Sequence, residues 1–477
     1  MRTILLLLLW GCQPTVPVSF PPTNADTVID IVDTGGGDTG ETEAVSTWPV
    51  DDVRAEPLSS VGTVIEVTWQ QAAPASASWI AYTHEGADTW METPVVPAAQ
   101  GENTQVLLGI PDDREVTFEI YSVIEGETHA SPEQYTAQTD DLPSDLRTPA
   151  LRELAEDGLS DARYMLISVD VGSSWFQGPY YVLILNRGGE VVWYRKTSGS
   201  RGSMFSRIAK SGDHLLIDAA TLYTFDESLD PTVTRLTLDG RHSVETVLPG
   251  MYYSWDELED GSFLYSAASN NYEFQMMRRY PDGSLEEVWA CYPWMAQFYP
   301  DMTWACAPNT VLYNERLGTV AWSMFETSTV VEIDLATGER VRHFGQIPGG
   351  WTVEPAEANF ELQHYPNYTA DGTLVLTTHV PTQPYVQAIR EFAFDDAREA
   401  LTQVWSYGED NGRYASYAGV VYRLDNGNTL VGYGTDGVLQ EVTPSGAVLW
   451  ELEWRDRLIG NMALLDDLYA LNAWDGE

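Results

Sequence analysis

A repeat of about 50 residues runs through the later part of this 477-residue chain and limits its fold more than any other feature. In five places a polar residue is followed by a glycine and an alternating apolar strand, as in "EDGSFLYS" and "ADGTLVLT". The glycines are Gly212, Gly261, Gly318, Gly372 and Gly427, at intervals of 49, 57, 54 and 55 residues. Between them falls a second strand that often ends in Trp, as in "GSLEEVW". Each unit is therefore a turn, a strand, another turn and another strand.

Units made only of strands can bury their faces only against neighbouring units, so the repeat predicts the blades of a β-propeller. Five units are clear in the sequence. A sixth would combine the strand at 181–186 with the segment at 462–471, so that the two ends of the repeat region close the ring. We therefore expect an all-β fold with a six-bladed β-propeller over residues 161–477.

Residues 51–142 show a different pattern, with short alternating runs such as "GTVIEVTWQQ" and "EVTFEIYSV" separated by turns. Such runs predict an antiparallel β-sandwich. With the "LLGIPDD" step they resemble a fibronectin type III module, which belongs to the Ig-like sandwiches and usually acts as a spacer or adhesive surface. A linker is expected at 143–160, with a short amphipathic turn or helix at 149–156.

The first residues, "MRTILLLLLWGCQPT", have one positive charge, a short apolar run and then Gly11 and Cys12. The run is far shorter than the ~20 residues that span a bilayer, so residues 1–11 are predicted to be an export signal. The segment ending at Cys12 resembles a bacterial lipobox, although Trp10 departs from the usual small or aliphatic residue. The resemblance implies lipidation of Cys12, and Gln13 after it implies the outer membrane. The alternative is plain secretion.

Residues 12–50 are rich in Asp, Thr, Gly and Pro and are predicted to form a disordered acidic linker. The two remaining cysteines, Cys291 and Cys306, bracket a short loop. In an oxidising compartment such a pair favours a disulfide, with two free buried thiols as the alternative. No His or further Cys lies at ligand spacing, so we expect no metal site there.

The charge balance excludes one class of partner. The chain has 25 basic and 71 acidic residues, a net charge of −46. Such a field repels nucleic acid and favours divalent cations. The acidic "DTG" pieces could hold calcium, but no Asp-Xaa-Asp-Xaa-Asp loop is present. No cofactor motif is found, and none is expected.

Three segments of the repeat region resemble the bacterial arylsulfotransferases. They are "NFELQHYPNYTADGTLVL", "APNTVLYNERLGTVAWSMFETSTVVEIDLATGERVRHFG" and "SYAGVVYRLDNGNTLVGYGTDGVLQEVTPSGAVLWEL". The resemblance covers most of 160–477. It implies an exported six-bladed propeller that moves a sulfuryl group from a phenolic sulfate to another phenol. In this family a nucleophilic His, two other His and an Arg converge on the central channel.

Of these four positions, the resemblance retains one. His364, which follows Gln363, matches the nucleophile, and a neutral imidazole suits attack on sulfur. The His of the family's His-Asn pair corresponds to Pro308, before Asn309. The earlier His falls at Tyr252 or Tyr253.

The expected Arg falls at Phe325, or at Glu326 if the alignment slips by one residue. Each lost anion contact would remove ~2–4 kcal/mol of transition-state stabilisation. A cation could still reach the channel from Arg316, Arg342, Arg279 or Lys210.

Two functions follow from this comparison. In the first, the protein is a degenerate family member that binds a ligand or partner. A small aromatic or phenolic molecule could stack on the aromatic residues of the loop "CYPWMAQFYPDMTWAC", for which ordinary loop packing is the alternative. In the second, it is an active aryl-sulfate sulfotransferase that forms a sulfo-histidine at His364, with Tyr253 as acid or base. Substrate contacts are expected from Gln363, Asn309 and Tyr365. The substituted positions favour the first function.

Overall fold

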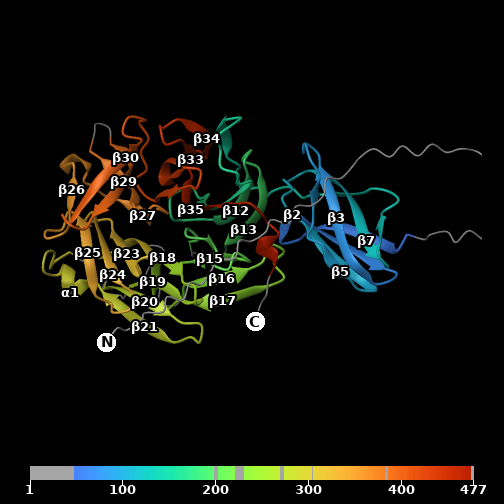
Figure 1. The fold of residues 1–477 in the computed structure, drawn as a ribbon, viewed down its shortest axis with the longest axis horizontal. Helices are drawn as coiled ribbons and strands as arrows, with labels where there is room; N and C mark the ends of the chain where they lie inside the picture. Colours follow the sequence, from blue (N-terminus) through green and yellow to red (C-terminus); the bar gives the residue numbers. More distant parts are fainter. Residues whose placement is uncertain are drawn as a thin grey trace, which may run out of the picture. The chain divides into compact units, whose positions relative to one another are not determined.

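The fold is seen in a computed structural model that describes residues 48–197, 202–220, 230–268, 273–302, 304–381 and 385–473 (Figure 1). The predicted signal at 1–11, Cys12 and nearly all of the linker lie outside these residues. From Trp48 onward the chain forms one unit, built almost wholly from strands. Its helical elements are short: α1 (Tyr292–Met295), η1 (Ala356–Ala358), η2 (Gly434–Asp436) and η3 (Ala470–Asn472). None of the helices in these ranges is long and apolar enough to cross a bilayer.

The segment before Asp140 forms two antiparallel sheets that share one hydrophobic core. Alternation explains the core, because Val116, Phe118 and Ile120 are buried in one strand while the residues between them are partly exposed. The first sheet has the order β1 (Val50–Leu58), β2 (Val61–Gln71), β6 (Gly101–Leu107). The second contains β3 (Ala75–His84), β4 (Met91–Glu92), β5 (Val96–Ala98), β7 (Glu115–Ile124), β8 (Glu127–Ala130) and β9 (Tyr135–Gln138). The likeness to fibronectin type III stays a prediction.

The remaining strands form six sheets, and Figure 1 shows them following one another around a common centre. This confirms the predicted propeller. From the centre outward, the blades are: blade 1, β35 (Leu458–Leu465), β11 (Tyr164–Asp170), β12 (Tyr180–Asn186), β13 (Val191–Thr197); blade 2, β14 (Arg207–Ile208), β15 (Leu215–Ala219), β16 (Thr232–Leu236), β17 (Ser243–Val247); blade 3, β18 (Met251–Glu257), β19 (Phe263–Ala268), β20 (Phe274–Arg279), β21 (Leu285–Ala290); blade 4, β22 (Pro308–Asn314), β23 (Thr319–Met324), β24 (Thr329–Asp334), β25 (Arg340–Gly345); blade 5, β27 (His364–Tyr368), β28 (Leu374–Val380), β29 (Val386–Asp395), β30 (Ala400–Tyr407), β26 (Thr352–Glu354); and blade 6, β31 (Gly419–Arg423), β32 (Thr429–Tyr433), β33 (Val438–Val442), β34 (Val448–Glu453), β10 (Ala150–Leu154).

Blade 1 closes the ring in the predicted way. β35, from the C-terminal part of the chain, pairs antiparallel with β11, from Tyr164 opposite Leu465 to Asp170 opposite Leu458. The blade therefore combines strands from both ends of the repeat region. The segment predicted as a turn or helix at 149–156 is instead the strand β10, which pairs with β34. That prediction was wrong, because a free outer strand edge on blade 6 supplied hydrogen-bond partners that outweigh local helix preference.

Tryptophans within outer strands join neighbouring blades. The indole N–H of Trp193 donates to the carbonyl of Leu238 on the next blade, at 2.7 Å. Trp450 donates to Arg187 at 2.8 Å in the same manner, across the junction between blades 6 and 1. Each indole thus buries its ring and satisfies its one donor in the same contact. The Trp that ends the repeat in the sequence is therefore a link between blades.

Candidate functional site

The candidate site lies at the start face of the propeller, the face at which the six innermost strands begin. Residues within three positions of these starts line a small cavity, with at least one contributed by each blade. Its volume open to the centres of water molecules is about 10 Å³, enough for roughly one water. Lining residues used below are Phe205, Tyr253, Asn309, His364, Tyr365 and Asn461. The predicted nucleophile and acid thus come together, from blades 5 and 3.

A bulge in β27 explains why two successive side chains reach the same cavity. The pairing of β27 with β28 is irregular between His364 and Asn367, and Tyr365 has a left-handed φ of 48°. In a regular strand, neighbouring side chains point to opposite faces, whereas a bulge redirects one of them. His364 and Tyr365 can therefore both face the channel. A non-glycine residue in this conformation is strained, and such strain is concentrated at functional sites.

The imidazole of His364 is buried and neutral. Only 6% of the residue is exposed, and its ring centroid lies 4.9 Å from that of Phe325. Burial, with a smaller effect from His379, lowers the pKa of His364 from 6.5 to about 3, although a hydrogen bond to the carbonyl of Leu362 opposes the change. A neutral imidazole can act as a nucleophile or a hydrogen-bond acceptor. It cannot hold an anion by charge.

Hydrogen bonds to blade 4, made through Gln363 and Asn309, position His364. The amide nitrogen of Gln363 donates to Ser323 Oγ at 3.0 Å and to the carbonyl of Met324 at 3.0 Å. The side chain therefore points into blade 4 and does not line the cavity, unlike the substrate contact that we predicted. Asn309 Nδ2 donates to the carbonyl of Gln363 at 2.5 Å. Asn309 Oδ1 is buried and accepts no hydrogen bond from the residues that the structure describes, so the cavity has one acceptor to offer.

Tyr365 belongs to a hydrogen-bonded chain across the channel. Its hydroxyl lies 2.5 Å from that of Tyr422, which donates to Asn461 Oδ1 at 2.7 Å. Asn461 Nδ2 then donates to the carbonyl of Ser206 at 3.0 Å. The chain links blades 5, 6, 1 and 2, and burial raises the pKa of Tyr365. Sequence reasoning missed Tyr422 and Asn461, although comparing the innermost strands of successive repeats would have placed both on the channel.

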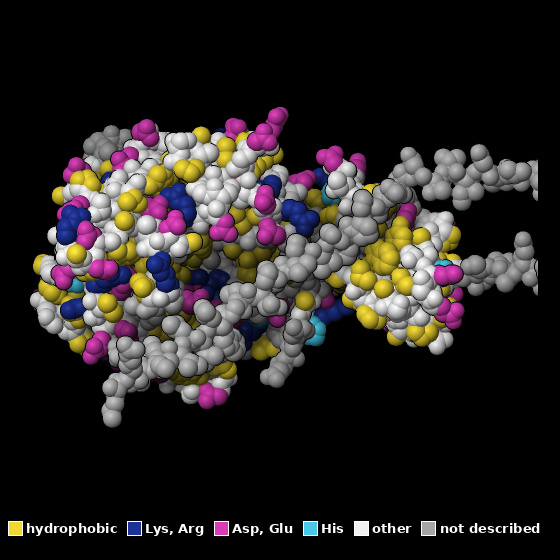
Figure 2. All heavy atoms as spheres, in the orientation of Figure 1, with side chains coloured by type: hydrophobic (Ala, Val, Ile, Leu, Met, Phe, Trp, Pro, Cys, Tyr) yellow, Lys and Arg dark blue, Asp and Glu magenta, His cyan; other side chains and the backbone are white. Residues whose placement is uncertain are grey.

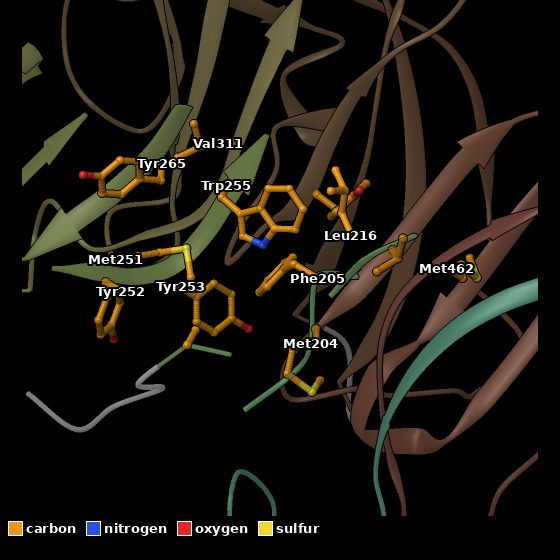
Figure 3. Packing of buried hydrophobic residues seen from close by; sticks show 14 of the residues in the cluster. Met204, Phe205, Leu216, Met251, Tyr252, Tyr253, Trp255, Tyr265, Val311 and Met462 are labelled. Carbon is orange, nitrogen blue, oxygen red and sulfur yellow. The ribbon is translucent and has the colours of Figure 1, made fainter. Parts of the chain in front are cut away.

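The structure distinguishes the two tyrosines that the sequence left as alternatives. Tyr253 lines the cavity and its ring lies 4.8 Å from that of Phe205, beside which it is drawn in Figure 3. Tyr252 instead packs against Phe274 at 5.3 Å and against Trp304 at 6.3 Å. Tyr253 is therefore the residue that could contact a ligand of His364.

No Lys or Arg lines this cavity among the residues that the structure describes. Arg342 pairs with Glu332 at 2.6 Å, and Arg279 donates to the carbonyl of Tyr280 at 3.3 Å. Arg316 and Lys210 line a different cavity, where the innermost strands end. The predicted alternative cations therefore do not reach His364, and at the position expected for the family's Arg, Phe325 puts an apolar ring against the imidazole.

A chain of aromatic rings leads from His364 to the protein surface. Phe325, which touches His364, lies 5.9 Å from Tyr417 and 6.2 Å from His379, and His379 lies 5.1 Å from Tyr414. Tyr414 in turn lies 6.3 Å from Tyr385. The exposed members are Tyr385 (46%), Tyr414 (40%) and Tyr417 (37%). We call Phe325, Tyr385, Tyr414 and Tyr417 the aromatic belt. Exposed ring faces beside a channel suit stacking on a planar ligand.

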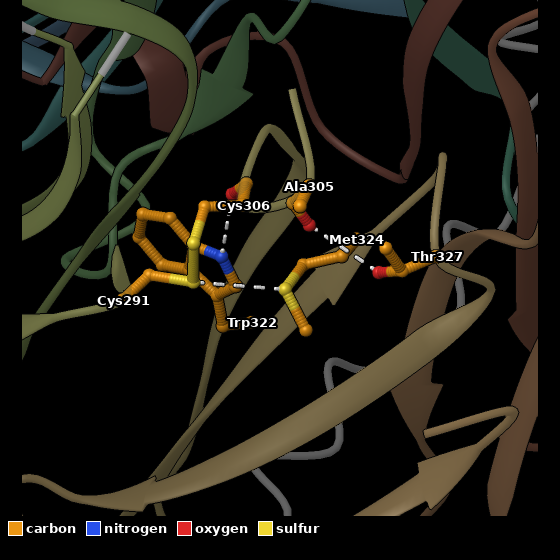
Figure 4. The surroundings of a disulfide bond; sticks show 6 residues. All are labelled: Cys291, Ala305, Cys306, Trp322, Met324 and Thr327. Carbon is orange, nitrogen blue, oxygen red and sulfur yellow. Dashed lines mark hydrogen bonds between the residues drawn. A yellow bond between two sulfur atoms is a disulfide. The ribbon is translucent and has the colours of Figure 1, made fainter. Parts of the chain in front are cut away.

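A disulfide joins Cys291 to Cys306 and closes the loop before β22 (Figure 4). The indole of Trp322 donates to the carbonyl of Cys306 at 3.2 Å, and Thr327 Oγ1 donates to that of Ala305 at 3.3 Å. Both cysteines are buried. The cross-link thus holds the loop that carries Trp304 near Tyr252 and the start of β22, which supplies Asn309.

The buried histidines predict a pH-dependent stability. Burial lowers the pKa of His343 and of His379 as well as that of His364. Between pH ~6.5 and the lowered value, the unfolded chain binds protons that the folded chain does not, so stability falls as the pH falls, by up to about 1.4 kcal/mol per pH unit for one group. Urea unfolding at several pH values should show this loss. His364→Asn should reduce the slope of the free energy of unfolding against pH, and equal slopes for the variant and the parent would contradict the prediction.

Comparison with known proteins yields only similarities of fold. No family model matches the chain, and no curated protein matches it. A protein of unknown function from Bacteroides caccae is 14% identical, with 64% of this chain and 100% of that chain covered and a TM-score of 0.43. A streptogramin B lyase is 12% identical, with 65% and 88% covered and a TM-score of 0.38. A periplasmic gluconolactonase from Pseudomonas aeruginosa is 11% identical, with 82% and 99% covered and a TM-score of 0.37. The assignment of this chain as a β-propeller rests on its own strand pairing.

Proposed function

We propose that the protein binds a small, uncharged aromatic ligand, such as a phenol, at the start face of its propeller. The observation that carries this proposal is the composition of the wall around His364. It combines a neutral imidazole with aromatic rings and, among the residues described, has no cation. A phenol ring would stack on the aromatic belt. Because the His364 cavity holds roughly one water, only the hydroxyl would enter it, where it would donate to Asn309 Oδ1 or to the neutral His364.

The resemblance to arylsulfotransferases supports a second candidate. In that reaction the imidazole nitrogen of His364 attacks sulfur, the bond between sulfur and the phenolic oxygen breaks, and the leaving phenolate takes a proton from Tyr253 or water. The neutral state of His364 favours attack. The sulfate oxygens, however, need cationic or N–H donors in the transition state, and the described wall offers neither Lys nor Arg. Binding without transfer is therefore the better supported function.

The two functions give opposite results with phenol and phenyl sulfate. We expect calorimetry to detect phenol binding and to show much weaker binding of phenyl sulfate, because the sulfate charge would be buried without a partner. Intact-mass analysis after incubation with phenyl sulfate should show no adduct. An adduct of roughly 80 Da that is lost in His364→Ala would establish the transferase instead. If neither compound binds, the proposed aromatic site is wrong.

Variants of the exposed tyrosines test where the ligand stacks. Tyr414→Ala should weaken phenol binding by about 2- to 10-fold, the range expected when one ring contact is lost. Tyr292→Ala is the matched control, because Tyr292 is equally exposed at 43% but lies in α1, outside the aromatic belt. Equal effects of the two variants would contradict the stacking site.

We further propose that the protein is exported and anchored to the bacterial outer membrane by lipid on Cys12, with residues 51–142 as a fibronectin III-like spacer. The apolar run before Cys12 and the following linker support this localisation. The Cys291–Cys306 disulfide is consistent with an oxidising compartment. Mass spectrometry of the native protein should find the lipid on a peptide that begins at Cys12, and Cys12→Ala should release the protein from membranes.

A further inference from the structure

The channel has a second opening at the end face of the propeller, the face at which the innermost strands end. A cavity of about 550 Å³ opens there, which is within the range of small-molecule sites, ~300–1,000 Å³. The chain of Tyr365, Tyr422 and Asn461 separates it from the His364 cavity, since Tyr365 lines one and Tyr422 the other. We call this cavity the end-face mouth. Its charged lining residues are Arg207, Lys210, Asp256, Glu257 and Arg423.

The two carboxylates in the end-face mouth are already occupied by donors of the protein. Asp256 Oδ2 accepts from the amide of Tyr313 at 2.9 Å, and its Oδ1 lies 3.2 Å from Arg207 Nη1. Glu257 Oε1 accepts from Arg235 Nη2 at 2.8 Å, and its Oε2 accepts from the amide of Lys210 at 2.7 Å. Each oxygen of both carboxylates therefore already has a donor from the protein.

The positive charges of the end-face mouth are less completely balanced. Arg207 pairs with Asp256, and Arg423 pairs with Glu391. Lys210 is exposed and forms no ion pair within the described part of the chain, although the molecule carries a net charge of −46. The chain has only two lysines, and the other, Lys196, is paired with Asp145 at 2.6 Å. Figure 2 shows Lys and Arg side chains beside the hollow near the middle of the propeller.

We propose that the end-face mouth binds a small oxyanion, a carboxylate or a phosphate, with the ammonium group of Lys210 as its main contact. Lys210 is the charged donor of the lining without an ion-pair partner in the described part of the chain, and the oxygens of both carboxylates already have protein donors, so an acceptor-rich ligand would supply the partner that Lys210 lacks. The partly buried pair of Arg207 and Asp256 forms a fixed polar wall beside it. A neighbouring cavity of about 660 Å³ shares Lys210 but also contains Glu315 and Asp371, so the proposal is limited to the end-face mouth. It is independent of the aromatic site.

The presence of only two lysines permits a direct test on the full chain. An amine-acylating reagent would label Lys196 and Lys210, and peptide mass spectrometry would quantify each. We expect inorganic phosphate or citrate to slow labelling of Lys210 severalfold and to leave Lys196 unchanged. Comparing the two anions identifies which oxyanion binds better. Sodium chloride at matched ionic strength should protect neither lysine, because it screens charge without supplying an oxyanion that could occupy the cavity.

Calorimetry of a variant supplies the second measurement. Lys210→Gln should weaken binding of the better anion about tenfold, as expected for one charge-assisted hydrogen bond, whereas Lys196→Gln should not change it. Both lysines are exposed, so the variants should fold as the parent does. The proposal is overturned if neither anion protects Lys210, if sodium chloride protects it equally, or if Lys210→Gln binds the anion as tightly as the parent.

Discussion

Replacing Arg187 with Met is expected to lower the free energy of unfolding by about 3–5 kcal/mol, because it leaves the buried carboxylate of Glu441 without its counter-ion. The side chain of Glu441 is 0% exposed and that of Arg187 is 15% exposed. Glu441 also accepts hydrogen bonds from the amide of Ser160 at 2.7 Å and from Asn428 Nδ2 at 2.8 Å. These bonds and Arg187 together hold the pKa of Glu441 below its usual value against the opposing effect of burial.

The position of this ion pair makes the effect global. Arg187 lies in the turn after β12 of blade 1, Glu441 lies in β33 of blade 6, and Arg187 also stacks on Trp450 at 4.7 Å. The pair therefore supports the junction at which the ring closes. Urea unfolding measures the loss. Arg152→Met is the control, because the Arg152–Glu453 pair is exposed and should contribute less than about 1 kcal/mol.

A double variant separates loss of charge balance from loss of packing. Arg187→Met with Glu441→Gln should recover part of the stability, since no charge then remains buried. If Arg187→Met costs less than 1 kcal/mol, Ser160 and Asn428 suffice to stabilise the carboxylate and the counter-ion argument is wrong. If the double variant recovers nothing, the contact of Arg187 with Trp450 is the important one.

Removing the disulfide is the second change for which we expect a large effect. Cys291→Ala with Cys306→Ala should lower the free energy of unfolding by about 3 kcal/mol, the value expected for a cross-link that closes a loop of this length, with 15 residues of sequence separation. The cross-link stabilises chiefly by restricting the unfolded chain. Because the loop also precedes Asn309, phenol binding should weaken as well.

Reductant provides the internal control for this prediction. Urea unfolding of the parent with a strong thiol reductant should approach the curve of the double variant, while the variant itself should not respond. If parent and double variant unfold at the same urea concentration without reductant, the cross-link contributes no stability and the prediction fails.

The repeat accounts for how much of the fold could be predicted. A glycine turn and an alternating strand are local patterns, so Gly261 or Gly372 marks a blade without any knowledge of its neighbours. The closure of the ring was predictable for a related reason, because a sixth unit was complete only when strands from both ends of the repeat region were combined. His364 begins β27, the innermost strand of blade 5, but the sequence indicated this residue only through the family resemblance and not through the repeat.

The candidate site was less predictable, since it is assembled from strands that lie far apart in the chain. The choice between Tyr252 and Tyr253 depends on the side of β18 that faces the channel. The inward turn of Tyr365 depends on a bulge in the pairing with β28. Gln363 turns into blade 4 because three acceptors lie there, at Ser323, Met324 and Thr329.

Sequence periodicity therefore determined the class of fold and the number of blades, because both depend on hydrogen bonds and burial within one repeat and its neighbour. The contents of the channel were decided by packing in three dimensions. Phe325 and His364 come from different blades, as do the residues of the chain from Tyr365 to Asn461. Lys210 likewise lines the end-face mouth together with residues of other blades. Such contacts have no local pattern in the chain, since the residues meet only when six innermost strands surround one axis.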